Sequence, residues 1–298
     1  MAEINGKTKV YGIVGNPVGH SLSPLMHNAA FAALGENRVY VGFPTEDIAD
    51  AVKGIRALNI RGVSVTIPHK ESIIPCLDAV DPVALRIGAV NTVSVVGQGA
   101  TRLLCGSNTD WVGANRALTN HIDLRGRHVV LLGAGGSARA IAFGLMEAGA
   151  KVTLCSRTEA RGRKLAADLR CPWHPLTAIE QLAGDVLVNA TSVGMDPATD
   201  DSLVPGGVLE NFAVVMDIVY SPFETRLLRE AMAAGCKVVH GLEMLLYQGV
   251  AQFELWTGQA APVELMQTVL WRATGNTAHV QEVIAHAGSL GYTMALDE

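Results

Sequence analysis

A lysine and an aspartate that each follow an apolar run are well placed in this sequence for acid–base chemistry. Lys70 ends the segment VTIPHK (65–70), and Asp110 ends the segment GSNTD (106–110). A lysine–aspartate pair in a cleft can donate a proton to a carbonyl oxygen, which is worth roughly 10²–10⁴-fold in rate. From these segments alone, Lys70 could equally be a surface lysine, and Asp110 could cap a helix.

Two further polar clusters also follow apolar runs, which is where the active sites of α/β proteins usually lie. Ser21 and Ser23 straddle a predicted helix start and could hold an anion or a polyol, although Ser23 could also be an N-cap. Asn91 stands early in a strand-like run, as a polar ligand or as a turn residue. The histidines of these segments lack metal-ligand spacing, so we expect structural roles for them and no metal site.

Residues 129–158 have the pattern of a dinucleotide-binding unit. An apolar run (129–132) ends in the glycine turn 133–136, a helical pattern follows, and a second apolar run covers 151–155. In such a unit Gly133 permits the turn, Gly135 lets the backbone approach a pyrophosphate, and Ala138 lets the helix pack against the sheet. The helix N-terminus adds free N–H groups and a partial positive charge.

The end of the second apolar run indicates which dinucleotide is bound. NAD enzymes usually have a carboxylate about 20 residues after the glycine turn, where it binds the ribose hydroxyls. Here the position holds Ser156, followed by Arg157, Thr158 and Arg161. Guanidinium groups bind a 2′-phosphate with charge-assisted hydrogen bonds, which favours NADP. The alternative is that both arginines are ordinary solvated helix charges.

The elements that would position these groups alternate between strand and helix. Strands are expected at 10–14, 39–43, 62–67, 89–96, 101–105, 129–132, 151–155, 186–189, 214–219 and 237–239, and helices at 24–34, 48–58, 110–121, 243–256 and 263–273. This order predicts an α/β protein with two domains separated by a cleft: an N-terminal substrate domain with a mainly parallel sheet, and a Rossmann-type dinucleotide-binding domain. The sequence after Gly275 has a weak helical pattern and no assigned role.

Composition excludes several classes of protein. The 298 residues are 49% hydrophobic, enough for two cores, and the net charge of −5 argues against a nucleic-acid partner. Five scattered cysteines without C-x-x-C spacing favour a reducing compartment. No signal-peptide pattern or apolar stretch of membrane-spanning length is present, so we expect a cytoplasmic protein without a membrane partner.

Taken together, these motifs resemble the shikimate dehydrogenase family over nearly the whole length. The matching segments are GNPVGHSLSPLMHN (15–28), VTIPHK (65–70), GAVNT (88–92), GSNTDWVG (106–113), GAGGSAR (133–139), SRTEAR (156–161), NATSVGM (189–195), DIVYSPFETRLL (217–228) and GLEMLLYQG (241–249). The resemblance implies NADPH-dependent reduction of 3-dehydroshikimate to shikimate, on the route to aromatic amino acids. One departure is Ser156, where the family often has asparagine.

The resemblance also implies residue roles. Lys70 and Asp110 would be the catalytic pair. Substrate ligands would be Ser21, Ser23, Thr66, Asn91 and Gln248, with Tyr220 a further candidate. The cofactor would contact Gly133, Ala134, Gly135, Gly136, Ser137, Ser156, Arg157, Thr158, Arg161, Gly241 and Met244. The terminal helices would rejoin the first domain, giving a substrate domain of 1–108 plus 243–298 and an NADP-binding domain of 109–242.

Three alternatives remain open from the sequence. The first is a quinate or shikimate dehydrogenase that uses NAD. The second is a non-catalytic dinucleotide-binding sensor of the same fold, against which Lys70 and Asp110 weigh. The third is a folate-linked dehydrogenase of similar shape, although the Ser21/Ser23 loop fits a small polyol acid better than a pterin. The expected partner is a small-molecule substrate, and the chain could be a monomer or a homodimer.

Overall fold

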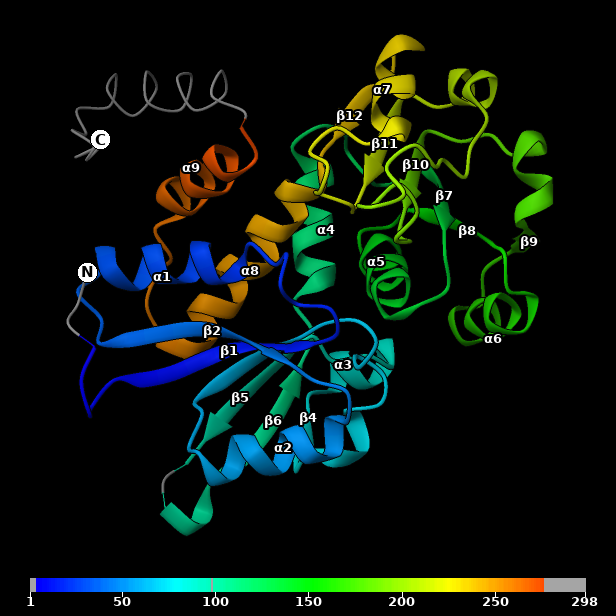
Figure 1. The fold of residues 1–298 in the computed structure, drawn as a ribbon. Coiled ribbons are helices and arrows are strands. Elements are labelled where there is room, and N and C mark those ends of the chain that lie inside the picture. Colours follow the sequence, from blue (N-terminus) through cyan, green and yellow to red (C-terminus); the bar gives the residue numbers. More distant parts are fainter. Residues whose placement is uncertain (1–3, 98, 276–298) are drawn as a thin grey trace.

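The computed structural model describes residues 4–97 and 99–275, which form two six-stranded sheets with helices on both faces of each (Figure 1). The predicted α/β class with a Rossmann-type sheet is confirmed. The sequence after Gly275, for which we predicted a weak helical pattern, lies outside the described residues. No helix in 4–97 or 99–275 is both long and apolar enough to cross a membrane.

The first sheet is mixed rather than purely parallel. Its strand order is β2 (Arg38–Pro44), β1 (Lys9–Gly15), β3 (Gly62–Val65), β5 (Thr92–Val96), β6 (Leu103–Ser107) and β4 (Ala79–Val80). Strands β2, β1 and β3 are parallel, whereas β5 runs antiparallel to both β3 and β6. The carboxyl ends of β1, β3 and β6 therefore lie at one edge of the sheet. The serine loop (Ser21 and Ser23) follows β1, the loop of Lys70 follows β3, and Asp110 follows β6.

The second sheet is parallel throughout. Its order is β12 (Lys237–Val239), β11 (Val214–Asp217), β10 (Val186–Asn189), β7 (His128–Leu132), β8 (Lys151–Ser156) and β9 (Trp173–Pro175). Alternate residues of β7 face different cores: Val129 and Leu131 pack under α4 and α5, and Val130 and Leu132 pack on the opposite face. Burial of both faces explains why these strands read as continuous apolar runs.

Helices cover each sheet on both faces. They are α1 (Ser23–Ala33), α2 (Ile48–Ala57), α3 (Pro82–Ile87), α4 (Asp110–Thr119), α5 (Gly136–Glu147), α6 (Glu159–Leu169), α7 (Arg226–Ala233), α8 (Gly241–Thr257) and α9 (Val263–Ala273), with short 3₁₀ turns at Ile74–Cys76, Gly99–Thr101, Leu176–Gln181 and Gly206–Asn211. On the first sheet, Tyr11 and Ile13 contact the core formed with α1, α8 and α9, while Val14 faces α2.

Helices α4 and α8 connect the two halves of the molecule and cross closely (Figure 1). Their approach requires a glycine at position 113, because a Cβ there would lie 2.8 Å from the Gln248 nitrogen and the Met244 carbonyl oxygen. Helices α8 and α9 contact each other, and both contact α1. This connectivity supports a discontinuous first domain, and we propose the boundaries 1–108 plus 243–298 and 109–242.

One local prediction is wrong. We expected that Ser23 could be the N-cap of the first helix, but the helix begins at Ser23, and Leu22 occupies the cap position without a side-chain hydrogen bond. The hydroxyl of Ser21 instead accepts a hydrogen bond from the Ser23 backbone N–H, at 3.3 Å. The capping of this helix start therefore comes from Ser21, and the Ser23 side chain lies within the first turn.

Candidate active site

The central feature of the site is an ion pair between Lys70 and Asp110. The Lys70 Nζ lies 2.6 Å from Asp110 Oδ2. Lys70 lies in the loop that follows β3, and Asp110 is the first residue of α4. Two separate segments of the chain therefore bring the two charged groups together. The side chains of Lys70 and Asp110 are only 15% and 5% exposed. A carboxylate buried to this extent requires a cationic or hydrogen-bonding partner.

Lys70 also contacts the second half of the molecule. Its Nζ donates a hydrogen bond of 3.1 Å to Ser137 Oγ, at the start of α5. The Lys70 side chain also packs against the glycine turn, because a Cβ on Gly136 would lie 3.0 Å from the Lys70 Cβ. The predicted catalytic lysine and the predicted dinucleotide turn are thus in direct contact.

Asn91 holds the second oxygen of the Asp110 carboxylate. Its Nδ2 donates to Asp110 Oδ1 at 2.7 Å and to Thr109 Oγ1 at 3.0 Å. Its Oδ1 accepts hydrogen bonds from the Thr109 N–H and the Thr92 hydroxyl, each at 2.7 Å. Asn91 is 2% exposed. The structure therefore places this predicted substrate ligand against the predicted catalytic pair.

The other predicted substrate ligands of the first domain lie at the ends of β1 and β3. Ser21 is half-buried and lies near Tyr220, whose pKa is raised by burial and lowered in part by Ser21. Tyr220 follows β11, so this contact also joins the two halves of the molecule. Ser23 is buried and lies near the Tyr40 hydroxyl. Thr66 directly follows β3, and its backbone N–H donates a hydrogen bond to the Val14 carbonyl oxygen.

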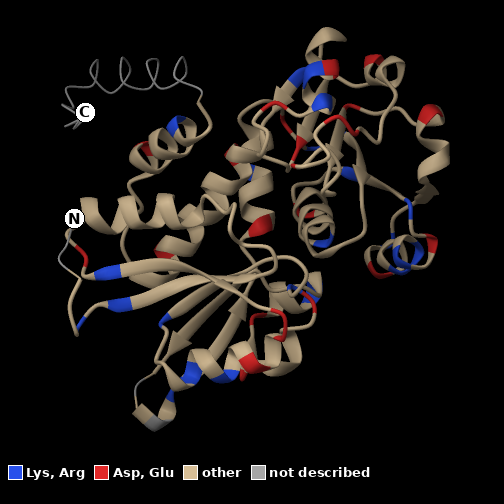
Figure 2. Ribbon diagram, viewed as in Figure 1, with Lys and Arg blue, Asp and Glu red and all other residues tan. Residues whose placement is uncertain are grey.

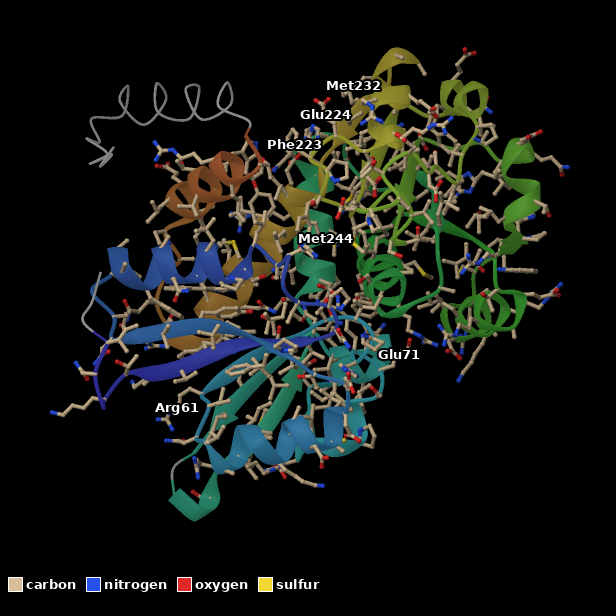
Figure 3. The ribbon with its side chains drawn as sticks, viewed as in Figure 1. Arg61, Glu71, Phe223, Glu224, Met232 and Met244 are labelled. Carbon is tan, nitrogen blue, oxygen red and sulfur yellow. The ribbon has the colours of Figure 1, made fainter. Side chains whose placement is uncertain are left out.

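Helix α8 contributes three of the predicted contacts. Gln248 is 8% exposed, and its Oε1 lies 3.4 Å from Asn91 Nδ2, which in turn contacts the predicted catalytic residue Asp110. Gly241 begins the helix where a Cβ would come within 2.5 Å of the Val219 carbonyl oxygen. Met244 is buried in the core that α4 and α5 share with the second sheet, and Figure 3 shows it near the start of α8.

The glycine turn has the local geometry that its sequence predicts. Gly133 has φ of +114°, a conformation that favours glycine. A Cβ on Gly135 would meet no atom within 4 Å, so the space beside this residue is open. Helix α5 begins at Gly136 and has no side-chain cap, which leaves the N–H groups of its first turn available to an anion. Ala134 is half-buried beside the turn.

Comparison with known proteins agrees with this arrangement. Residues 13–93 match the shikimate dehydrogenase substrate binding domain, 115–203 match shikimate / quinate 5-dehydrogenase, and 241–270 match the shikimate 5'-dehydrogenase C-terminal domain. The shikimate dehydrogenase (NADP(+)) of Moorella thermoacetica is 46% identical over 289 residues, covering 92% of this chain and 97% of that protein. The chain belongs to the shikimate dehydrogenase family.

Solved structures of the shikimate dehydrogenase family have the same fold. A shikimate dehydrogenase in complex with NADP+ superposes with a TM-score of 0.83 at 39% identity, covering 92% of this chain and 98% of that one. The shikimate 5-dehydrogenase of Thermus thermophilus, in complex with NADP(H) and shikimate, superposes with a TM-score of 0.81 at 40% identity, covering 89% of this chain and 100% of that one.

The position at which this chain departs from the shikimate dehydrogenase pattern is buried. Ser156 is 5% exposed, and its hydroxyl accepts a hydrogen bond of 3.0 Å from Trp173 Nε1. By contrast, Arg157, Thr158 and Arg161 are exposed, and neither arginine forms an ion pair within the described residues. Figure 2 shows both basic and acidic residues on α6. The two guanidinium groups are thus free to bind a phosphate, whereas the Ser156 hydroxyl is engaged with Trp173.

Sequence reasoning missed a buried network at the carboxyl ends of β10 and β11. Asn189 Nδ2 donates to Asp217 Oδ1 at 2.9 Å, and the Thr225 hydroxyl donates to Asp217 Oδ2 at 2.7 Å. Burial raises the pKa of Asp217 to about 6, partly offset by these hydrogen bonds. The network fixes the loop of Thr191, next to Gly133, and the loop of Tyr220. The sequence did carry a signal for this network, because the polar residues Asn189 and Asp217 each end an apolar run.

An ion pair across the two halves was also missed. Arg139 of α5 lies 3.6 Å from Glu71 and 3.3 Å from Asp168, and its side chain is 12% exposed. Glu71, labelled in Figure 3, directly follows Lys70. Two separate contacts from α5, through Ser137 and Arg139, therefore hold the lysine loop.

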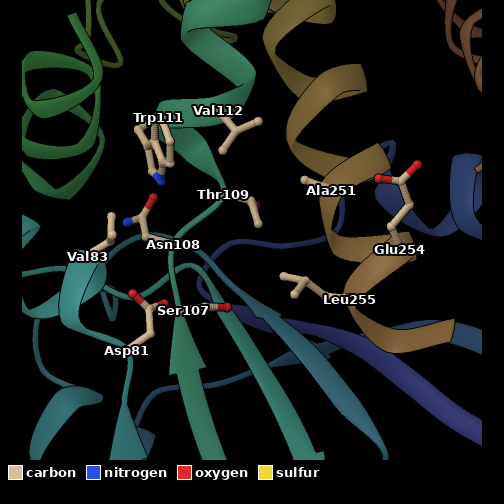
Figure 4. Close-up of a pocket in the computed structure, with 10 residues that line it drawn as sticks. All are labelled: Asp81, Val83, Ser107, Asn108, Thr109, Trp111, Val112, Ala251, Glu254 and Leu255. Carbon is tan, nitrogen blue, oxygen red and sulfur yellow. The ribbon is translucent and has the colours of Figure 1, made fainter. Parts of the chain in front are cut away.

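A separate hollow lies between the start of α4 and the second half of α8 (Figure 4). Its volume is about 520 Å³, and it is lined by Asp81, Val83, Ser107, Asn108, Thr109, Trp111, Val112, Ala251, Glu254 and Leu255. None of the predicted catalytic or substrate residues lines it. Within 4–97 and 99–275, no group of three or more His, Cys, Asp or Glu side chains could hold a metal ion.

Proposed function

We propose that this protein catalyses the reversible reduction of 3-dehydroshikimate to shikimate with NADPH, in the shikimate pathway that leads to aromatic amino acids. The observation that carries the proposal is the Lys70–Asp110 ion pair, which lies against the dinucleotide turn through the 3.1 Å contact of Lys70 with Ser137. A proton donor and the cofactor turn are therefore adjacent, as carbonyl reduction requires.

The residues at the carboxyl ends of β7 and β8 could bind NADPH. Open space beside Gly135 and the uncapped start of α5 would accept the pyrophosphate. The exposed guanidinium groups of Arg157 and Arg161, with Thr158, would bind the adenosine 2′-phosphate. Gly241 and Met244 would lie near the nicotinamide. When bound, NADPH supplies the hydride.

The proton comes from this chain. The Lys70 ammonium has three hydrogens, of which one is directed to Asp110 and one to Ser137. The third is left for the carbonyl oxygen of the substrate, where it stabilises the developing negative charge and is then transferred. Asp110 orients the ammonium, and Asn91 in turn fixes Asp110.

The substrate would bind between the serine loop and α8. Ser21 and Ser23 with Tyr220 would bind its carboxylate, and Thr66, Asn91 and Gln248 would bind its hydroxyls. These side chains come from both halves of the molecule, so substrate binding and the contact between the halves depend on each other. Holding the ketone in one orientation accounts for much of the expected rate.

A four-way steady-state comparison tests this function. The value of kcat/KM is measured for shikimate and for quinate, each with NADP⁺ and with NAD⁺. We expect the highest value for shikimate with NADP⁺. A preference for quinate with NAD⁺ would support the rival dehydrogenase, and cofactor binding without any turnover would support a non-catalytic sensor. The cytoplasmic location and the monomer or homodimer state are further predictions.

A further inference from the structure

Gln252 of α8 is not among the predicted ligands of substrate or cofactor, and its side chain is fully buried. Its Nε2 donates to Thr92 Oγ1 at 2.9 Å and to the Asn91 carbonyl oxygen at 3.2 Å. Its Oε1 accepts from the Ser64 hydroxyl at 2.8 Å. It lies one helical turn beyond Gln248, on the same face of α8.

These contacts form one directional chain of hydrogen bonds. The Tyr40 hydroxyl donates to Ser64 Oγ at 2.6 Å, so Ser64 uses its own hydrogen to donate to Gln252 Oε1. The amide of Gln252 is thereby oriented with its nitrogen toward Thr92. The hydroxyl of Thr92 accepts from Gln252 and uses its single hydrogen to donate to Asn91 Oδ1 at 2.7 Å.

The last hydrogen bond of this chain, from the Thr92 hydroxyl to Asn91 Oδ1, decides how the carboxylate of Asp110 is held. With Asn91 Oδ1 bound to Thr92 and to the Thr109 N–H, its Nδ2 must face Asp110 Oδ1. The flipped amide would place an oxygen against the carboxylate and lose both acceptor contacts. Asp110 in turn accepts a hydrogen bond from Lys70. The orientation of the Asn91 amide therefore also affects the position of the proton donor.

We infer that Gln252 is a positioning residue, which orients Asn91 through the hydroxyl of Thr92 and thereby fixes the Asp110–Lys70 pair for proton transfer. The inference deepens the proposed function and rests on it. Buried polar chains of this kind specify a single arrangement when every member is satisfied, and they lose that arrangement when one member is removed. The effect of breaking the chain should therefore appear in the proton-transfer step.

Three variants test the inference: Gln252→Met, Thr92→Val and the double variant. Methionine keeps the length of the side chain without a hydrogen-bonding amide, and valine keeps the shape of threonine without its hydroxyl. We expect each single change to lower kcat about tenfold, with KM for NADPH within about twofold of wild type. The double variant should lose no more kcat than either single one, because all three break the same chain.

Thr268→Val is the matched control. Thr268 is 2% exposed and lies on α9, where, among the residues that the structure describes, its hydroxyl bonds only to the Glu264 carbonyl oxygen of its own helix. This variant should have a lowered melting temperature and an unchanged kcat. If Gln252→Met does not fold, Thr92→Val alone decides the question.

Three results would overturn the inference: a folded Gln252→Met or Thr92→Val with wild-type kcat, losses that multiply in the double variant, or an equal loss in Thr268→Val. Wild-type turnover of 3-dehydroshikimate with NADPH is measured in the same assay. An active wild type with unaffected variants contradicts the inference alone. An inactive wild type contradicts the proposed function, and the inference with it.

Discussion

Gly135 and Gly136 are neighbours in the sequence, yet a side chain would meet different surroundings at each. Beside Gly135 there is open space, whereas a Cβ on Gly136 would press on the Lys70 Cβ at 3.0 Å. The two positions therefore separate the two tasks of the turn. We propose that Gly135 leaves room for the cofactor, while Gly136 allows the loop of Lys70 to approach.

Alanine at each of these positions should affect a different kinetic constant. Gly135→Ala should raise KM for NADPH by about tenfold or more, with the melting temperature unchanged, because the new methyl occupies space needed by the pyrophosphate. Gly136→Ala should lower kcat by about tenfold or more, because it displaces Lys70. Gly54→Ala in α2, where a Cβ meets no atom within 4 Å, is the control for a glycine change in a helix. Identical kinetics for the two turn variants would contradict this division.

We propose that single residues also decide which dinucleotide is bound. Arg157→Ala and Arg161→Ala should each raise KM for NADPH about 10–100-fold and change KM for NADH little, since each removes a charge-assisted hydrogen bond to the 2′-phosphate. Arg163→Ala is the matched control on α6, because Arg163 is paired with Glu159 at 2.7 Å and lies over the Trp173 ring. An NADPH affinity that falls equally in the Arg163 variant would reject the assignment.

At the scale of elements, the segments with an apolar pattern of their own were predictable, and those that depend on pairing with a neighbouring strand were not. The strands at 186–189 and 237–239 and the helix at 263–273 are confirmed with the same bounds, because apolar periodicity and flanking turn residues define them locally. The sequence did not predict β4, with two residues, or β9, with three. These strands exist only because a neighbouring strand pairs with them, which a local pattern cannot show.

The packing of α1 contains a histidine with consequences for stability. His27 is fully buried and stacks on Tyr40, with ring centroids 4.6 Å apart. Burial lowers the pKa of His27 from 6.5 to about 3. The folded protein keeps this ring neutral down to about pH 3, whereas the unfolded chain takes up a proton below pH 6.5. Acidification through this window therefore favours unfolding.

We expect His27 to reduce the free energy of unfolding by up to about 1.4 kcal/mol for each pH unit below 6.5. Urea unfolding from about pH 7 to about pH 4.5 measures this dependence. His27→Phe, which keeps an aromatic ring in the cluster, should flatten it, and substitution of the exposed His20 by alanine should not. Asp217 acts in the opposite direction, because its raised pKa lowers stability as the pH rises from 3.8 toward 6. Parallel curves for wild type and His27→Phe would contradict the account.

At the scale of the whole molecule, the site exists only where the two halves meet. The sequence named Lys70, Asp110 and the glycine turn, because polar residues at strand ends and a glycine pattern are local signals. It could not show that Lys70 touches Ser137, that Arg139 pairs with Glu71, or that Gln252 lies behind Asn91. Those contacts join residues far apart along the chain, and a glutamine within an apolar helix carries no motif.

The most direct test of the account is the steady-state kinetics of Lys70→Ala. With 3-dehydroshikimate and NADPH, kcat should fall by about 10²–10⁴-fold while KM for both ligands changes by less than about fivefold, because the ammonium acts on the carbonyl oxygen mainly as the reaction proceeds. A folded Lys70→Ala protein with near-normal kcat, or with a loss confined to KM, would contradict the assignment of Lys70 as the proton donor.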